Sequence, residues 1–161
     1  MKTEATLNVT TPTEREVVMT RVFDAPAARV FAALTTPALL RRWYGPPGWS
    51  MTVCEIDLRV GGAWRFVSSR PDGRAVGQKG VYREIVPARR LVNTEAWEDW
   101  DAGETLVTTT LDEHTGRTTL TSTMLFPSRD VRDTVLHSGL RQNAGALWDK
   151  LAALLAEGVA L

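Results

Sequence analysis

The chain has 161 residues, the size of one ordinary domain, and its 43% hydrophobic and 24% charged residues are normal globular values. Its 19 basic and 19 acidic residues give a formal net charge of zero, which argues against nucleic acids and acidic membrane surfaces as partners. The single cysteine excludes an internal disulfide, residues 1–15 lack the apolar run of a signal peptide, and no run approaches the ~20 apolar residues of a membrane span. We therefore expect a cytoplasmic protein without a membrane span.

The N-terminal part of the chain divides into a tail and a first strand. Residues 1–14 are rich in threonine and show no periodicity, so we expect a flexible tail, followed by a single domain over residues 15–161. Residues 16–23, with the sequence EVVMTRVF, are typical of a β-strand.

Two short helices are expected next. Asp24 can cap a helix and is followed by Pro26 in the first turn, after which apolar residues recur at helical spacing. Thr36 and Pro37 repeat this signal for a second helix. The prolines and glycines of residues 45–48 must end it, since proline removes a hydrogen-bond donor.

Residues 49–126 have the character of strands separated by turns. Glycine-rich or proline-containing turn signals divide this region into six β-rich segments. Together with the first strand they predict about seven strands, joined in sequence into an antiparallel meander.

A long helix is expected at the C-terminal end. The polar stretch of residues 127–132 interrupts the β pattern, and Ser138 is a candidate cap for a helix over residues 139 to about 157, roughly 28 Å long. Its apolar residues recur at spacings of three and four: Leu140, Ala144, Leu147, Leu151, Leu154 and Leu155.

This order of elements predicts an α+β fold. A sheet with one apolar face must bury it, and the C-terminal helix is the one long amphipathic element available. We therefore expect a curved antiparallel sheet that wraps around this helix, with an apolar cavity between the two and the short helices closing one end.

The order of elements and the residues at their joints resemble a known family, that of the activator of the heat-shock-protein-90 ATPase. It belongs to the START-like (SRPBCC) superfamily, which includes birch-allergen-like and polyketide-cyclase-like proteins. The matching stretches are residues 21–37, 39–49, 57–66, 80–92 and 139–155. The resemblance implies a helix-grip fold and often a small hydrophobic ligand in the cavity. Some relatives bind lipids or hormones, and others cyclise polyketides.

Aromatic residues are the first candidates for the cavity wall. Six tryptophans are more than a dry core of this size usually needs, and a large ring with a polar N–H suits a semi-polar cavity. The alternative is that they pack in the core. The predicted ligand-binding residues are Trp43, Trp64, Phe66, Tyr82, Glu84, Trp97, Met124, His137 and Trp148.

Charged residues offer a weaker case for chemistry. Arg83 and Glu84 interrupt an apolar strand, so one of them should point inward, where a charge orients a ligand. His137 is a candidate base near the cavity mouth. Glu55 and Asp57 share a strand face, as paired carboxylates in acid–base catalysis do, but at a strand end before the double glycine such residues more often stay solvated.

Motifs for other chemistries are missing from the sequence. One cysteine and two scattered histidines supply no metal site, and no nucleophile elbow or phosphate-binding loop occurs. The double glycine at 61–62 and the glycines at 77 and 80 are interpreted as turn and close-packing residues. We therefore expect no cofactor or metal, and favour non-catalytic binding of a small hydrophobic molecule. An enzyme of cyclase or hydrolase type, a co-chaperone-like interaction module and a homodimer are left open.

Overall fold

The computed structural model describes residues 6–45 and 47–157. Within these residues the chain forms eight strands and four helices. In chain order they are β1 (Asn8–Thr10), β2 (Glu16–Phe23), α1 (Ala27–Thr35), α2 (Pro37–Trp43), β3 (Ser50–Ile56), β4 (Ala63–Ser69), β5 (Ala75–Val86), β6 (Arg90–Trp97), β7 (Trp100–His114), β8 (Arg117–Leu125), α3 (Arg129–His137) and α4 (Leu140–Leu155).

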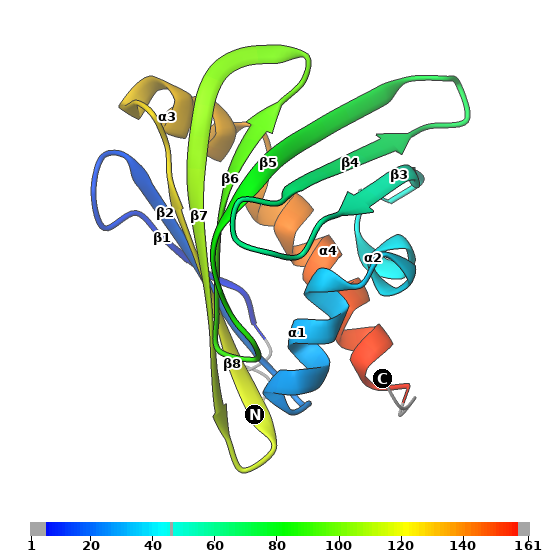
Figure 1. Ribbon diagram of the computed structural model, residues 1–161. Coiled ribbons are helices and arrows are strands. Elements are labelled where there is room, and N and C mark those ends of the chain that lie inside the picture. The colour runs from blue at the N-terminus through cyan, green and yellow to red at the C-terminus, as the bar shows by residue number, and fades with distance from the viewer. Residues whose placement is uncertain (1–5, 46, 158–161) are drawn as a thin grey trace.

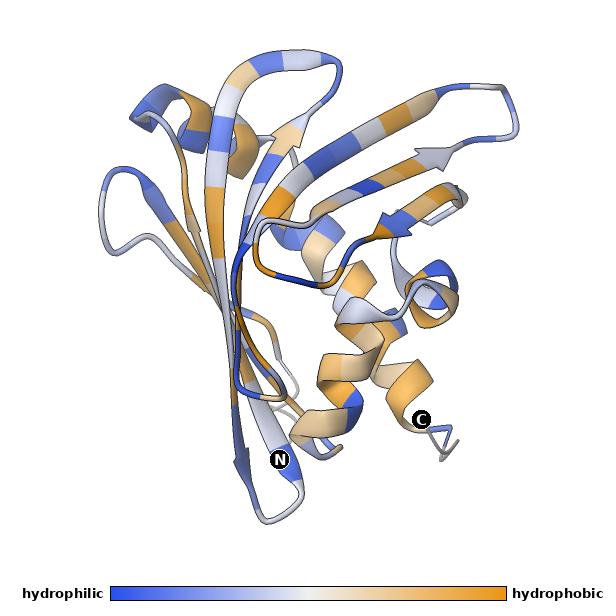
Figure 2. Cartoon of the chain, viewed as in Figure 1, coloured by the Kyte–Doolittle hydropathy of each residue, from blue (hydrophilic) through white to orange (hydrophobic). Residues whose placement is uncertain are grey.

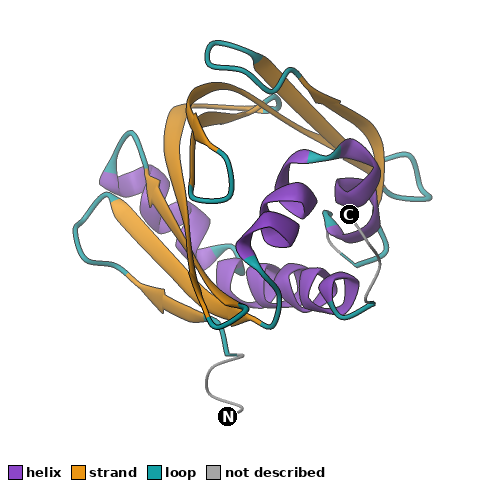
Figure 3. Cartoon of the chain, turned by 60° about the horizontal axis from the view of Figure 1, so that its bottom comes forward, coloured by secondary structure: helices purple, strands orange, loops and turns teal. Residues whose placement is uncertain are grey.

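The strands form one antiparallel sheet in the order β1-β2-β8-β7-β6-β5-β4-β3. Strands β3 to β8 follow one another as a meander, and β2 joins its end by pairing with β8. The sheet curves around α1, α2 and α4, which lie inside the arch (Figures 1 and 3). This arrangement confirms the predicted α+β helix-grip fold.

Alternation along the strands selects the face that packs on the helices. In β8 every second residue from Thr118 to Met124 is buried, and hydrophobic and hydrophilic residues alternate along the strands in Figure 2. Helix α4 buries Ala144, Trp148, Leu151, Leu154 and Leu155, which confirms most of the predicted apolar stripe. Leu140 and Leu147 are half-buried. No helix within the described ranges has the length and apolar content needed to cross a bilayer.

The expected tail contains one more strand than the sequence pattern indicated. Residues 8–10 form β1, which pairs with β2 so that Val9 lies opposite Met19. A three-residue strand is too short to show periodicity, and it forms because an edge of β2 is free to pair.

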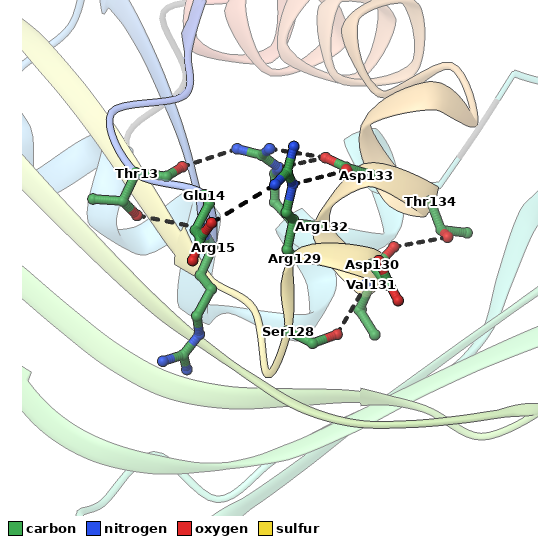
Figure 4. A network of polar contacts seen from close by, with 10 residues as sticks. All are labelled: Thr13, Glu14, Arg15, Ser128, Arg129, Asp130, Val131, Arg132, Asp133 and Thr134. Atoms are coloured by element: carbon green, nitrogen blue, oxygen red, sulfur yellow. Dashed lines mark hydrogen bonds and ion pairs between the residues drawn. The ribbon is translucent and has the colours of Figure 1, made fainter.

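Helix α3 was also missed, because the sequence analysis expected only a break in the β pattern here. None of its residues is fully buried, although Val131, Val135 and Leu136 are half-buried and pack against the core. Its N-cap is Ser128, whose Oγ accepts a hydrogen bond from Val131 N at 3.2 Å. Arg132 Nη1 donates to Thr13 O at 2.9 Å, and Arg129 pairs with Glu14 across 3.9 Å (Figure 4). Polar contacts with the segment before β2 and partial burial of these apolar residues therefore hold α3 in place.

Two predicted helix caps are wrong. Asp24 does not cap α1; instead Ala27 N donates to Glu113 Oε1 at 2.7 Å, from the neighbouring β7. Ser138 ends α3, and Gly139 precedes α4 with a left-handed φ of 93°. Glycine suits this position, where the chain turns directly from one helix into the next.

Two glycines give opposite predictions for substitution by alanine. A Cβ on Gly80 would lie 2.6 Å from Trp64 Nε1 and would also meet Thr94 O, whereas a Cβ on Gly145, within α4, would meet nothing within 4 Å. We expect Gly80→Ala to lower the free energy of unfolding by about 1–3 kcal/mol through overpacking. Gly145→Ala should raise it by about 0.5–1 kcal/mol, because glycine weakens a helix interior. Urea denaturation of both variants checks this pair, and equal midpoints would contradict it.

Candidate functional site

A cavity of about 130 Å³ lies between the concave face of the sheet and helices α1 and α2. Strands β4 to β7 supply most of its wall. The lining residues are Leu34, Leu40, Trp43, Tyr44, Trp64, Phe66, Tyr82, Leu91, Asn93, Glu95, Val107 and Thr109.

Period-two alternation brings these side chains to one surface. Trp64 and Phe66 lie two residues apart on β4, and Leu91, Asn93 and Glu95 do so on β6. The aromatic rings contact one another, with centroids 4.7 Å apart for Trp64 and Phe66. The wall is therefore largely aromatic and aliphatic.

The polar atoms of the aromatic residues are bound to the protein itself. Trp43 Nε1 donates to Ala33 O at 2.9 Å, and Trp64 Nε1 to Thr94 O at 3.2 Å. Tyr44 Oη donates to Gln78 Oε1 at 2.8 Å. These bonds fix the ring orientations and leave mainly apolar ring surface for the cavity.

Glu95 is the acidic residue of this wall. Its side chain is half-buried and has no hydrogen bond or ion pair with another residue of the described part of the chain. Burial raises the pKa of Glu95 from 4.5 to about 7, since the charged carboxylate loses hydration without gaining a partner. Near neutral pH this carboxyl group is present in both protonation states.

The tyrosines of the wall stay neutral. Burial raises the pKa of Tyr44, and the nearby charge of Glu95 raises it further. Burial likewise raises the pKa of Tyr82. Among these groups Glu95 is therefore the one that exchanges a proton near neutral pH.

Four of the nine predicted ligand-binding residues line the cavity: Trp43, Trp64, Phe66 and Tyr82. Trp43 comes from α2 and the other three from β4 and β5. The structure thus brings together aromatic residues that lie up to about forty positions apart in the sequence.

Glu84 and Trp97 lie outside the cavity for different reasons. The register shifts between Tyr82 and Glu84, and both Arg83 and Glu84 are exposed, so the expectation that one of them points inward is wrong. Glu84 instead pairs with Arg90 across 3.1 Å. Trp97 lies directly opposite Gln78, which in turn lies opposite the cavity residue Phe66, so Trp97 keeps the concave face but does not line the cavity.

Trp148, Met124 and His137 also lie away from the cavity wall. Trp148 is buried on α4 and packs edge-on against Phe23, with ring centroids 6.0 Å apart. Met124 is buried in the core on β8. His137 ends α3 and is exposed, so it does not reach this cavity.

The paired carboxylates and the cysteine are not part of the cavity wall either. Glu55 and Asp57 are exposed, and Asp57 binds Arg59 at 2.8 Å. Cys54 is buried, and burial raises the pKa of its thiol. A raised pKa disfavours the reactive thiolate.

Sequence reasoning missed Tyr44, Asn93 and Glu95. The signal for the last two was present, since Leu91, Asn93 and Glu95 share one face of a strand whose first member is apolar. An acidic residue on the same strand face as the apolar Leu91 predicts an inward-facing charge. The sequence analysis considered only Arg83 and Glu84 for this role.

Comparisons with known proteins agree with this fold. The family model described as "Activator of Hsp90 ATPase homolog 1-like protein" matches residues 24–156. A search of curated protein sequences finds no significant match.

Solved structures extend this similarity over nearly the whole chain. A protein from Rhodobacter sphaeroides is 32% identical with a TM-score of 0.89, and the alignment covers 94% of this chain and 98% of that one. Protein CV1439 from Chromobacterium violaceum is 26% identical with a TM-score of 0.76, covering 89% and 98%. CalU16 from Micromonospora echinospora shares the fold, with 21% identity, a TM-score of 0.63 and coverage of 94% and 84%. On the family match and the Rhodobacter structure, the chain belongs to the family of activator of Hsp90 ATPase homolog 1-like proteins.

Proposed function

We propose that this protein binds one small, largely apolar molecule in the cavity, oriented by a hydrogen bond to Glu95. The observation that carries the proposal is a single carboxyl group, without a partner in the described chain, in a wall made mainly of aromatic and aliphatic side chains. Buried polar groups are normally hydrogen-bonded, and a ligand that donates to Glu95 supplies the missing bond. Membership of a family whose fold suits ligand binding supports the same proposal.

The size of the cavity limits the ligand. An apolar cavity of about 150 Å³ holds one benzene-sized molecule, and the volume here is about 130 Å³. Most drug-sized ligands occupy roughly 300–1,000 Å³. A monocyclic aromatic molecule with one hydrogen-bond donor fits the described conformation, whereas a lipid requires the cavity to widen.

Phenol and toluene provide a direct test because they have nearly the same size, but only phenol carries a hydrogen-bond donor. At pH 8, where Glu95 is mainly ionised, we expect saturable one-to-one binding of phenol, about tenfold or more tighter than toluene. Glu95→Leu should remove this preference. Calorimetric titration measures both affinities, and quenching of tryptophan emission gives an independent readout.

A cavity-filling variant separates binding in the cavity from adsorption elsewhere. Val107 lines the cavity and is half-buried, so Val107→Phe should abolish phenol binding. Val76 is 36% exposed on β5 and does not line it, so Val76→Phe is the matched control and should bind phenol as the wild type does. Equal binding by the two variants, or non-saturating uptake, would exclude the cavity as the site.

A second candidate is an enzyme that uses Glu95 as a general acid or base. The pKa of about 7 supports it, since an acid–base catalyst works best when its pKa lies near the operating pH. Exchange of the methyl protons of acetophenone in D₂O, followed by NMR, tests this. A catalyst should accelerate the exchange with a rise near pH 7 that Glu95→Gln removes, and a simple binding protein should not. The cytoplasmic location and the homodimer remain predictions.

A further inference from the structure

A second concave site lies at the other side of the helix layer and shares no lining residue with the cavity. It is a cleft of about 420 Å³ between the end of β2, the first turn of α1 and the last turn of α4. These segments come together at the bottom of the view in Figure 1. The lining residues are Arg21, Val22, Phe23, Asp24, Arg29, Arg117, Ala152, Leu155 and Ala156.

Arg21 occupies a position that the alternation of β2 assigns to the core. It lies between Met19 and Phe23 on the buried face, and only 8% of it is exposed. Its Nη1 donates to Asp149 Oδ1 at 2.7 Å, and its guanidinium lies 5.1 Å from the centre of the Phe23 ring. Its Nε is buried and has no hydrogen-bond acceptor in residues 6–45 and 47–157. A buried N–H without an acceptor is costly, so an arginine at this position calls for an explanation.

Arg29, in the first turn of α1, repeats this pattern. Its Nε and Nη2 are both buried, and neither finds an acceptor in the described part of the chain. Two arginines from different elements line the same cleft, and each carries a buried donor without an acceptor among the described residues. A guanidinium presents its donors in a planar fork that matches the oxygens of a phosphate or carboxylate.

The charge of the cleft suits an anion. Its wall holds three arginines against Asp24, and Asp149 binds Arg21 from a position where 75% of the aspartate side chain is exposed. The rest of the wall is mainly apolar, with Ala152, Leu155 and Ala156 from α4. A positive wall beside an apolar one fits an oxyanion that carries an apolar substituent.

The arginines could instead compensate the negative end of the α4 dipole. In that case their N–H groups would donate to the last carbonyl oxygens of the helix. Within the described residues the Nε atoms of both arginines and Nη2 of Arg29 donate to no carbonyl oxygen, so this alternative does not account for them.

We propose that this cleft binds an oxyanion of the phosphate class, inorganic phosphate or a phosphate monoester, through the guanidinium groups of Arg21 and Arg29. Arg117 lines the same cleft and adds positive charge. The site does not depend on the proposed function of the cavity, because the two share no residue.

Thermal unfolding in phosphate and in chloride of equal ionic strength tests the proposal. Phosphate should raise the midpoint of the wild type in a saturable way, because a ligand that binds only the folded state stabilises it. Arg29→Gln should weaken the phosphate affinity about tenfold or more. In chloride the same variant should unfold at an equal or higher temperature than the wild type, since it removes two unpaired buried donors. The wild type should therefore have the higher unfolding midpoint in phosphate, whereas Arg29→Gln should have an equal or higher midpoint in chloride.

A matched control removes the same charge elsewhere. Arg59 lies outside the cleft, with 71% of its side chain exposed, so Arg59→Gln should leave the phosphate affinity unchanged. Parallel titrations with phenyl phosphate and with acetate, followed by calorimetry, compare a monoester and a carboxylate with inorganic phosphate. No saturable phosphate effect, acetate binding as tightly as phosphate, or equal losses in Arg29→Gln and Arg59→Gln would each overturn the proposal.

Discussion

At pH 8 we expect Glu95→Gln to be more stable than the wild type by on the order of 3 kcal/mol. The pKa of Glu95 is about 7 in the folded protein against 4.5 for the free group, and each unit of difference corresponds to about 1.4 kcal/mol. Glutamine has nearly the same shape as the protonated acid and carries no charge. The variant therefore removes the cost of burying an unpaired carboxylate and leaves the packing of the cavity wall intact. Chemical denaturation at pH 8 measures the difference.

The same pKa predicts how stability changes with pH. Between pH 4.5 and about 7 the folded state keeps the Glu95 proton while the unfolded state releases it, so the folded state binds more protons. The contribution of Glu95 to stability is therefore complete below pH 4.5 and is lost as the pH rises through about 7. The advantage of Glu95→Gln should be near zero at pH 4 and should grow across this window.

Glu84→Gln is the control for this experiment. Glu84 also lies on a strand but is exposed and paired with Arg90. Its replacement should change the free energy of unfolding by no more than about 0.5 kcal/mol at either pH. A Glu95→Gln variant that is no more stable than Glu84→Gln at pH 8 would show that Glu95 is solvated and would remove the polar anchor from the proposed ligand site.

Leu151→Ala should lower the free energy of unfolding by about 2–5 kcal/mol. Leu151 lies on α4 and none of its surface is exposed, so the shortened side chain leaves a cavity between this helix and its neighbours. A domain is stable by only ~5–15 kcal/mol, so this single change removes a large part of the total. Urea denaturation measures the loss.

Gln142→Ala on the same helix is the matched control. Gln142 is exposed, and alanine has the higher helix propensity, so the variant should stay within about 0.5 kcal/mol of the wild type. Lys150 is a less suitable control position, because its side chain is half-buried and its Nζ donates to Gly45 O at 3.4 Å. Similar midpoints for Leu151→Ala and Gln142→Ala would mean that α4 does not pack as the core helix of the grip.

Local periodicity was enough to predict the main elements. The spacing of apolar residues in α4, the alternation in β2 and β8, and the proline and glycine turn signals are properties of short segments, so they can be recognised without knowing the fold. The elements that were missed are short: β1 has three residues and pairs with β2, and α3 is held partly by a hydrogen bond from Arg132 to the distant Thr13. Of the site, Trp43, Trp64, Phe66 and Tyr82 were predicted from ring size and alternation.

The sequence by itself determined the α+β class, the order of the main elements and the apolar faces, because these follow from side-chain periods of two and 3.6 residues. Only the tertiary structure decided which polar groups face inward. The register shift after Tyr82 reverses the expected face of Glu84, and such an irregularity depends on pairing with a neighbouring strand. The meeting of Arg21 and Arg29 in one cleft likewise depends on how a strand end and a helix start pack against α4, which no local pattern contains.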